Sequence, residues 1–126
     1  MSRRVIVADD RPEILRLLQV RFEFEDDFEI VGEAANGAEA VELCRELQPD
    51  AAVLDVEMPV MRGDVAIPLL REVAPDVTIV LYTSAATIDL EAADGPDAIV
   101  DKAGHLDDVV IELRAALDRR AIRRAV

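Results

Sequence analysis

The stretch VIVADD at residues 5–10 is the first sign of the fold, because a short apolar run, Val5 to Ala8, ends in two adjacent acids, Asp9 and Asp10. Similar runs recur along the chain, and each is continuous instead of alternating between apolar and polar residues. Continuous runs of this length are typical of parallel strands that are covered on both faces. The other runs are AAVL at 51–54, TIVLY at 78–82 and AIV at 98–100.

A fifth run, FEIVGEA at residues 28–34, alternates instead. Its pattern predicts an edge strand with one apolar side and one more polar side. The residues expected on the apolar side are Phe28, Ile30, Gly32 and Ala34, and those expected on the other are Glu29, Val31 and Glu33.

Segments with helical spacing of apolar residues separate these runs. Alternation of strands with helices predicts an α/β fold, in which right-handed crossovers place helices on both faces of a parallel sheet. The final helix has the clearest pattern. The four apolar sets are Ile14, Leu18 and Phe22; Val41, Cys44 and Leu47; Val65, Leu69 and Val73; and Leu106, Val109, Val110, Leu113 and Leu117.

The composition of the 126 residues is that of one globular domain, which we expect to span 1–126. No apolar run approaches the ~18 residues that cross a bilayer, so we expect a soluble, cytoplasmic protein. The lone cysteine, Cys44, has no partner for an internal disulfide and is expected to be a buried thiol.

The net charge of −13 opposes anionic lipid and the phosphate backbone of nucleic acids, so neither membrane binding nor direct nucleic-acid binding is expected. One basic cluster departs from this balance near the C-terminus. It either complements the dipole of the final helix or forms a locally basic face. The cluster consists of Arg114, Arg119, Arg120, Arg123 and Arg124.

Polar residues follow the apolar runs directly, at the strand ends where open parallel sheets place their ligand sites. Asp9 and Asp10 follow the first run, Asp55 the third, Thr83 the fourth and Lys102 the fifth. Two like charges about 4 Å apart repel by about 4 kcal/mol at an effective dielectric near 20, so three converging carboxylates call for a cation. Oxygen ligands of this kind suit Mg²⁺, and Lys102 supplies a second positive charge.

Taken together, the paired acids, the loop DVEMPVMRG at 55–63, the hydroxyl of Thr83 and the only lysine of the chain, Lys102, form an ordered set. This set resembles the receiver domain of two-component response regulators, and the resemblance covers essentially the whole chain. It implies a flavodoxin-like three-layer sandwich with a five-stranded parallel sheet in the order 2-1-3-4-5.

The resemblance also implies a role for each site residue. Asp55 would be the phosphoacceptor, and Asp10, Asp55 and the backbone carbonyl of Glu57 would bind Mg²⁺, with Asp9 acting through a coordinated water. Thr83 would hydrogen-bond the incoming phosphoryl group.

Lys102 would pair with Asp55 before transfer and with the phosphoryl oxygens afterwards. Pro59 and Gly63 would shape the loop that brings the Glu57 carbonyl inward.

A receiver domain of this kind accepts a phosphoryl group from a sensor histidine kinase or a histidine phosphotransfer protein. It then binds a downstream protein target, or forms a homodimer linked to phosphorylation. It is not a turnover enzyme, since it catalyses only its own phosphorylation and dephosphorylation. The chain is either a separate receiver or the receiver part of a longer regulator, in which case the arginine-rich end begins a linker.

Three features depart from the family pattern. Ile99 occupies the position, three before the lysine, where receivers usually have the aromatic residue that moves with Thr83. The segment between Thr83 and Ala98 is short, which predicts a stunted fourth helix and an atypical output surface. Glu57 either tunes hydrolysis of the aspartyl phosphate or is an exposed loop residue.

The sequence leaves two alternative functions open. One is a degenerate receiver that binds partners without phosphorylation. The other is a phosphatase of the haloacid dehalogenase type, which also uses an Asp nucleophile with Mg²⁺ and a lysine but has that nucleophile after its first strand.

Overall fold

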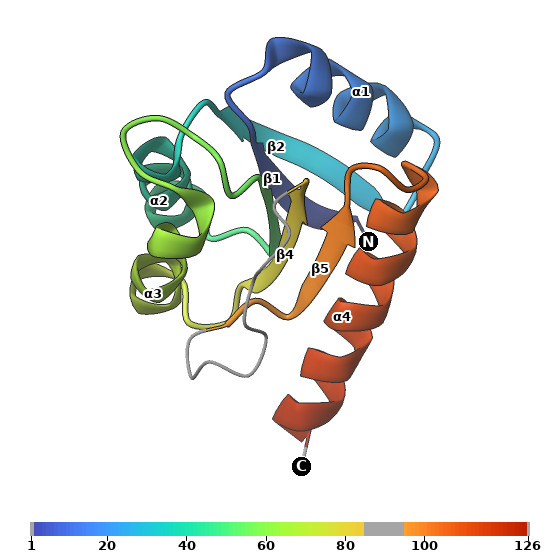
Figure 1. Ribbon diagram of the computed structural model, residues 1–126. Helices are drawn as coiled ribbons and strands as arrows, with labels where there is room; N and C mark the ends of the chain where they lie inside the picture. The colour runs from blue at the N-terminus through green and yellow to red at the C-terminus, as the bar shows by residue number, and fades with distance from the viewer. Residues whose placement is uncertain (1, 85–94, 126) are drawn as a thin grey trace.

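The computed structural model describes residues 2–84 and 95–125, which fold into three layers (Figure 1). Five strands of the described residues form one parallel sheet in the order β2-β1-β3-β4-β5. Helices α1 and α4 cover one face of this sheet, and α2 and α3 cover the other. The predicted flavodoxin-like α/β fold, including its strand order, is therefore confirmed.

The strands are β1 (Arg3–Ala8), β2 (Phe28–Ala34), β3 (Ala51–Leu54), β4 (Thr78–Thr83) and β5 (Ala98–Asp101). The helices are α1 (Pro12–Glu23), α2 (Gly37–Leu47), α3 (Gly63–Val73) and α4 (Asp107–Ala125). None of the helices in the described part of the chain is both long and apolar enough to span a bilayer.

Two apolar layers hold the helices to the sheet. Successive side chains of β1 enter opposite layers, so that Ile6 packs beneath α2 and α3, whereas Val7 packs beneath α1 and α4. Both layers need apolar side chains, which explains why the central strands read as continuous apolar runs. Cys44 lies fully buried in the α2 and α3 layer, and burial raises the pKa of its thiol to about 12.

The final helix buries the predicted residues, since Val109, Val110, Leu113 and Leu117 are all buried and Leu106 is partly buried. The expected inner faces of α1 and α2 are also confirmed. The residues that confirm them are Leu18, Phe22, Val41 and Cys44, which are buried, and Ile14 and Leu47, which pack at the margins of the core.

Two of the three residues predicted for the inner face of α3 are wrong, and only Val73 packs at the margin of the core. Val65 is 55% exposed and Leu69 is 38% exposed, whereas Ala66, Ile67 and Leu70 are the residues that pack beneath the helix. Apolar residues surround most of this helix, so spacing alone does not select one face. The helix begins at Gly63, where a Cβ atom would lie 1.9 Å from the Asp55 backbone oxygen, so its first turn packs closely against the end of β3.

Strand β2 is an edge strand, as predicted, but its side chains do not keep one alternation. Val5 pairs with Ile30 and Ile6 pairs with Gly32, so β2 contains one extra residue at this point. Such a bulge transfers the following residues to the other face. Phe28 and Ile30 therefore pack toward α1 and α4, whereas Ala34 packs in the opposite layer, and the prediction that they share a side is wrong.

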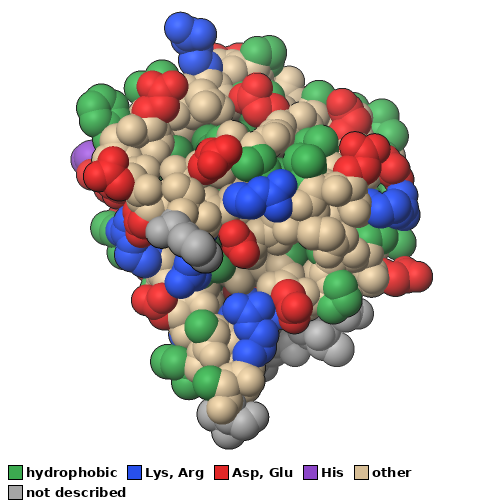
Figure 2. Space-filling model, turned by 180° about the vertical axis from the view of Figure 1, so that it is seen from behind, with side chains coloured by type: hydrophobic (Ala, Val, Ile, Leu, Met, Phe, Trp, Pro, Cys, Tyr) green, Lys and Arg blue, Asp and Glu red, His purple; other side chains and the backbone are tan. Residues whose placement is uncertain are grey.

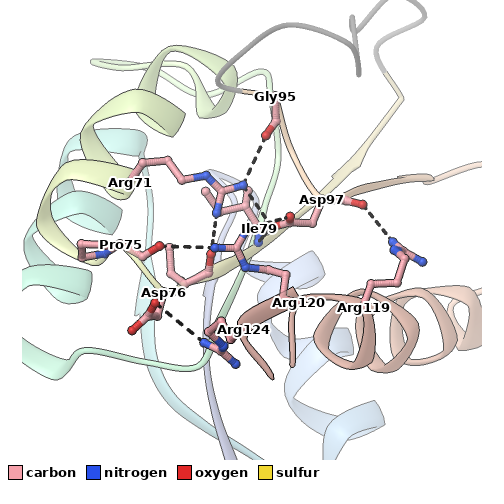
Figure 3. A network of polar contacts seen from close by, with 10 residues as sticks. Arg71, Pro75, Asp76, Ile79, Gly95, Asp97, Arg119, Arg120 and Arg124 are labelled. Atoms are coloured by element: carbon pink, nitrogen blue, oxygen red, sulfur yellow. Dashed lines mark hydrogen bonds and ion pairs between the residues drawn. The ribbon is translucent and has the colours of Figure 1, made fainter. Parts of the chain in front are cut away.

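Asp97 joins several elements at the end of the sheet where β5 begins (Figure 3). Its carboxylate lies 3.0 Å from Nη2 of Arg71 on α3 and 3.1 Å from Nη1 of Arg120 on α4. The backbone N–H of Ile79 in β4 also donates to Asp97 Oδ2, over 2.8 Å. One carboxylate thus ties two helices to two strands, and we call this set the Asp97 clamp.

Four arginines of α4 make internal contacts, which argues against a separate basic face. Arg114 pairs with Asp27 at 2.9 Å, Arg119 donates to the backbone oxygen of Asp97 at 3.0 Å, and Arg124 lies 3.9 Å from Asp76. Acidic and basic side chains are interspersed over the face of the molecule shown in Figure 2. This arrangement favours a structural role for the arginine cluster.

We predict that Asp97→Ala lowers the free energy of unfolding by about 2–4 kcal/mol, because Arg71 and Arg120 would keep partly buried charges without their carboxylate. Urea denaturation measures the change. Asp118→Ala is the matched control, since that side chain is 67% exposed and lies 3.9 Å from Arg3. If Asp97→Ala lost no more free energy of unfolding than the control, the stabilising role of the Asp97 clamp would be contradicted.

Candidate functional site

Polar side chains from separate strand ends meet at the carboxyl edge of the sheet. Asp9 follows β1, Asp55 follows β3 and Lys102 follows β5. The Lys102 Nζ atom lies 2.6 Å from Asp9 Oδ2 and 3.1 Å from Asp55 Oδ2. The convergence expected from the sequence is therefore present.

The three carboxylates form one cluster. Asp9, Asp10 and Asp55 each offer an oxygen, and these oxygens all lie within 4.8 Å of one another. Asp9 is 1% exposed and Asp55 is 5% exposed, whereas Asp10 lies at the surface. One ammonium group cannot neutralise three carboxylates, so the donor set suits a small divalent cation with a preference for oxygen ligands.

Backbone hydrogen bonds direct Asp9 inward. Its own N–H donates to the Ala34 oxygen of β2, over 3.0 Å, and its carboxylate accepts from the Arg11 N–H, also over 3.0 Å. Burial raises the pKa of Asp9 above its ordinary value, even though the hydrogen bonds from Lys102 and Arg11 act to lower it. Burial is therefore the largest influence on this carboxyl group.

The loop after Asp55 packs against the site because it ends at a glycine, Gly63 at the start of α3, where no side chain fits. A Cβ atom on Gly63 would lie 1.9 Å from the Asp55 backbone oxygen. The Gly63 N–H also donates to the Val56 oxygen, over 3.0 Å, and the Gly37 N–H donates to the Met61 oxygen, over 2.8 Å. These contacts close the loop beside the carboxylate of Asp55.

Lys102 is bound by both buried carboxylates. Burial alone would lower the pKa of Lys102, but the hydrogen bonds to Asp9 and Asp55 outweigh this effect and raise the pKa above its ordinary value. The side chain is therefore a cation at neutral pH. The sequence predicted the pair with Asp55 but missed the pair with Asp9, because nothing local to either residue signals that contact.

Thr83 and Glu57 differ in their relation to the cluster. Thr83 is 2% exposed at the end of β4, and its backbone oxygen accepts from the Lys102 N–H over 3.1 Å. The Glu57 side chain is 67% exposed and lies 3.6 Å from Arg62 Nη1. That position favours the exposed-loop interpretation of the Glu57 carboxylate, and the role expected for its backbone carbonyl stays a prediction.

Ile99 pairs with Leu81 in the sheet and packs against the layer formed with α2 and α3. Residues 85–94, within the segment where the sequence predicts a stunted helix, lie outside the described residues, so that prediction is not tested.

Comparison with known proteins identifies the class. The model of the response regulator receiver domain family matches residues 5–110, and the chain therefore belongs to this family. Receiver domains catalyse only their own phosphoryl transfer. The position of Asp55 after β3 also separates this chain from haloacid dehalogenase phosphatases, whose nucleophile follows the first strand.

Relatives place this domain within longer proteins. The uncharacterized transcriptional regulatory protein YhcZ of Bacillus subtilis is 38% identical over 81 residues, which are 64% of this chain and 38% of that protein. Protein-glutamate methylesterase/protein-glutamine glutaminase 2 of Photobacterium profundum is 32% identical over 98% of this chain and 34% of its own length. The chain thus spans about a third of these two relatives.

A solved structure of a two-component response regulator of the LuxR family, from Aurantimonas sp. SI85-9A1, has the same fold. It superposes with a TM-score of 0.84 at 26% identity and covers 95% of this chain and 88% of its own.

We predict that Asp9→Asn changes how stability depends on pH in the absence of metal. Because the folded pKa of Asp9 is raised above its ordinary value of 3.8, the stability from this group is present below that value and is lost as pH rises through the raised pKa. The asparagine side chain of the variant does not titrate, so the variant does not lose this stability as the pH rises. The free energy of unfolding of the variant minus that of the wild type should therefore increase with pH.

Urea denaturation in EDTA, at several values between about pH 4 and 7, measures the difference. Asp26→Asn, at an exposed position, is the control. A stability difference between Asp9→Asn and wild type that stays constant with pH would refute the assignment.

Proposed function

We propose that this chain is a phosphorylatable switch of two-component signalling, in which Asp55 accepts a phosphoryl group. The observation that supports this most directly is the contact of Asp55 with Lys102 inside a cluster of three carboxylates. Asp55 is nearly buried, yet it lies at the open edge of the sheet where parallel folds bind ligands.

Asp9, Asp10 and Asp55, together with the backbone carbonyl of Glu57, would hold Mg²⁺. Their oxygens fit this ion, since they are hard ligands gathered in one small region. When bound, Mg²⁺ supplies positive charge that offsets the carboxylates and the phosphoryl oxygens.

The phosphoryl transfer requires positioning more than acid-base chemistry. A carboxylate oxygen of Asp55 attacks phosphorus in line, and the bond from phosphorus to the donor nitrogen or oxygen breaks, with its electron pair leaving on the donor. Lys102 is already charged and directed at Asp55, so it neutralises charge on the transferring oxygens. The Thr83 hydroxyl donates a hydrogen bond to the same group.

The donor would be a phosphohistidine on a sensor kinase or on a histidine phosphotransfer protein. The phosphorylated form would bind a downstream protein or a second copy of the chain. The assembled cluster favours this switch over a receiver that works without phosphorylation. A single receiver domain over 1–126 and a cytoplasmic location stay predictions from the sequence.

Ile99 in place of the usual aromatic residue supports an atypical output mechanism. Its aliphatic side chain packs into the core and lacks the ring whose rotation reports phosphorylation in other receivers.

We predict that Mg²⁺ stabilises the folded protein through these carboxylates. At a concentration ten times its dissociation constant, Mg²⁺ should raise the free energy of unfolding by about 1.4 kcal/mol, because it binds only the folded state. Asp10→Asn should require several times more Mg²⁺ for the same increase. Urea denaturation at a series of Mg²⁺ concentrations measures the increase in the free energy of unfolding, and Asp26→Asn serves as the control. If Asp10→Asn and wild type needed the same Mg²⁺ concentration for the same increase, the proposed metal site would be contradicted.

We predict that incubation with Mg²⁺ and acetyl phosphate adds one base-labile phosphoryl group to the wild type and none to Asp55→Asn. Intact-mass measurement detects the adduct. Lys102→Arg should slow its formation at least about tenfold, because a planar guanidinium cannot follow the oxygens as an ammonium does. An adduct that forms equally in Asp55→Asn would place the phosphoacceptor elsewhere.

A further inference from the structure

The Tyr82 ring lies beside the Lys102 ammonium. The Lys102 Nζ atom lies over the face of the Tyr82 ring, 5.7 Å from its centroid. This distance lies within the range of a cation–π interaction. Tyr82 is only 7% exposed and packs with Val80 and Val100 in the layer beneath α1 and α4, so the ring is held in place.

The strand order explains why a side chain at the end of β4 can position the lysine. Lys102 follows β5, whereas Asp55 follows β3, and β4 lies between them. Two strand spacings amount to roughly 10 Å, so the lysine side chain must cross the end of β4 to reach the carboxylates. Tyr82 lies at that end, directly before Thr83.

We propose that Tyr82 is a positioning residue for phosphoryl transfer, which it serves by holding the Lys102 ammonium toward Asp55. This inference rests on the proposed function of Asp55. The ammonium has three donors, and Asp9 and Asp55 accept from two of them. The ring attracts the charge through its π face instead of through a carboxylate, so it does not compete with a phosphoryl oxygen for the third donor.

Tyr82 is distinct from the aromatic residue that receivers usually have before the lysine. That position is Ile99, which packs in the α2 and α3 layer, whereas Tyr82 packs in the opposite layer. A purely structural Tyr82 would only fill space in the core, and an aliphatic side chain would then leave the rate of phosphoryl transfer unchanged. The two cases therefore differ in that rate, provided that the ring lies against the ammonium.

A spectroscopic test uses the fact that Lys102 is the only lysine. Protein labelled with [¹³C]lysine gives a single set of ε-CH₂ signals, which the ring current of Tyr82 should shift upfield. We expect this shift in wild type and in Tyr82→Phe, and its loss in Tyr82→Leu. The measurement needs neither Mg²⁺ nor a phosphoryl donor, so its result is independent of the proposed function; an unchanged signal in Tyr82→Leu would overturn the inference.

A kinetic test then examines the consequence. With Mg²⁺ and acetyl phosphate, Tyr82→Phe should form the adduct within about twofold of the wild-type rate, and Tyr82→Leu should be about fivefold slower. Equal rates for Tyr82→Leu and wild type would refute the role of Tyr82, whereas a wild type without any adduct would refute the proposed function itself.

Circular dichroism establishes that Tyr82→Leu is folded. If Tyr82→Leu is unfolded, pentafluorophenylalanine at position 82 replaces it, because this residue preserves the ring shape and reverses the ring quadrupole. The phosphoryl adduct should then form about fivefold more slowly than in wild type. A wild-type rate in that protein would overturn the inference.

Discussion

The ion pairs of Lys102 with Asp9 and Asp55 are the interaction on which the site depends. Parallel strands bring two nearly buried carboxylates to the same edge, where burial disfavours their charge and each repels the other. Lys102 offsets part of this repulsion before any ligand arrives, and the remaining negative charge makes the cluster suited to a cation. The same ammonium is in contact with the carboxylate that would be phosphorylated.

The two ends of the sheet serve different purposes. At the carboxyl end, acids gather in an arrangement that is electrostatically unfavourable without a partner. At the opposite end, the Asp97 clamp satisfies one carboxylate with two guanidinium groups and a backbone N–H. The clamp and the two apolar layers provide the stability that permits the acidic cluster, which is a common division between scaffold and functional site.

Local sequence patterns predicted which segments form helices and strands better than they predicted which side of each element faces the core. The inner face of α4 was correct because most of its large apolar residues share one stripe, with only Ile111 and Ile122 exposed outside it. The face of α3 was largely wrong because apolar residues surround that helix, so their spacing did not single out Ala66, Ile67 and Leu70 as the buried residues. The alternation of β2 failed at a bulge, whose extra residue depends on pairing with β1.

The residue types at each strand end, and therefore the class of chemistry that the sheet edge could support, can be read from the sequence. Strand ends are readable because apolar runs stop where polar residues begin. The pairing of Lys102 with Asp9 in addition to Asp55, and the place of the Tyr82 ring beneath the ammonium, are visible only in the folded structure. Those contacts depend on strand order and on side-chain rotamers, and both arise from packing between residues far apart in the chain.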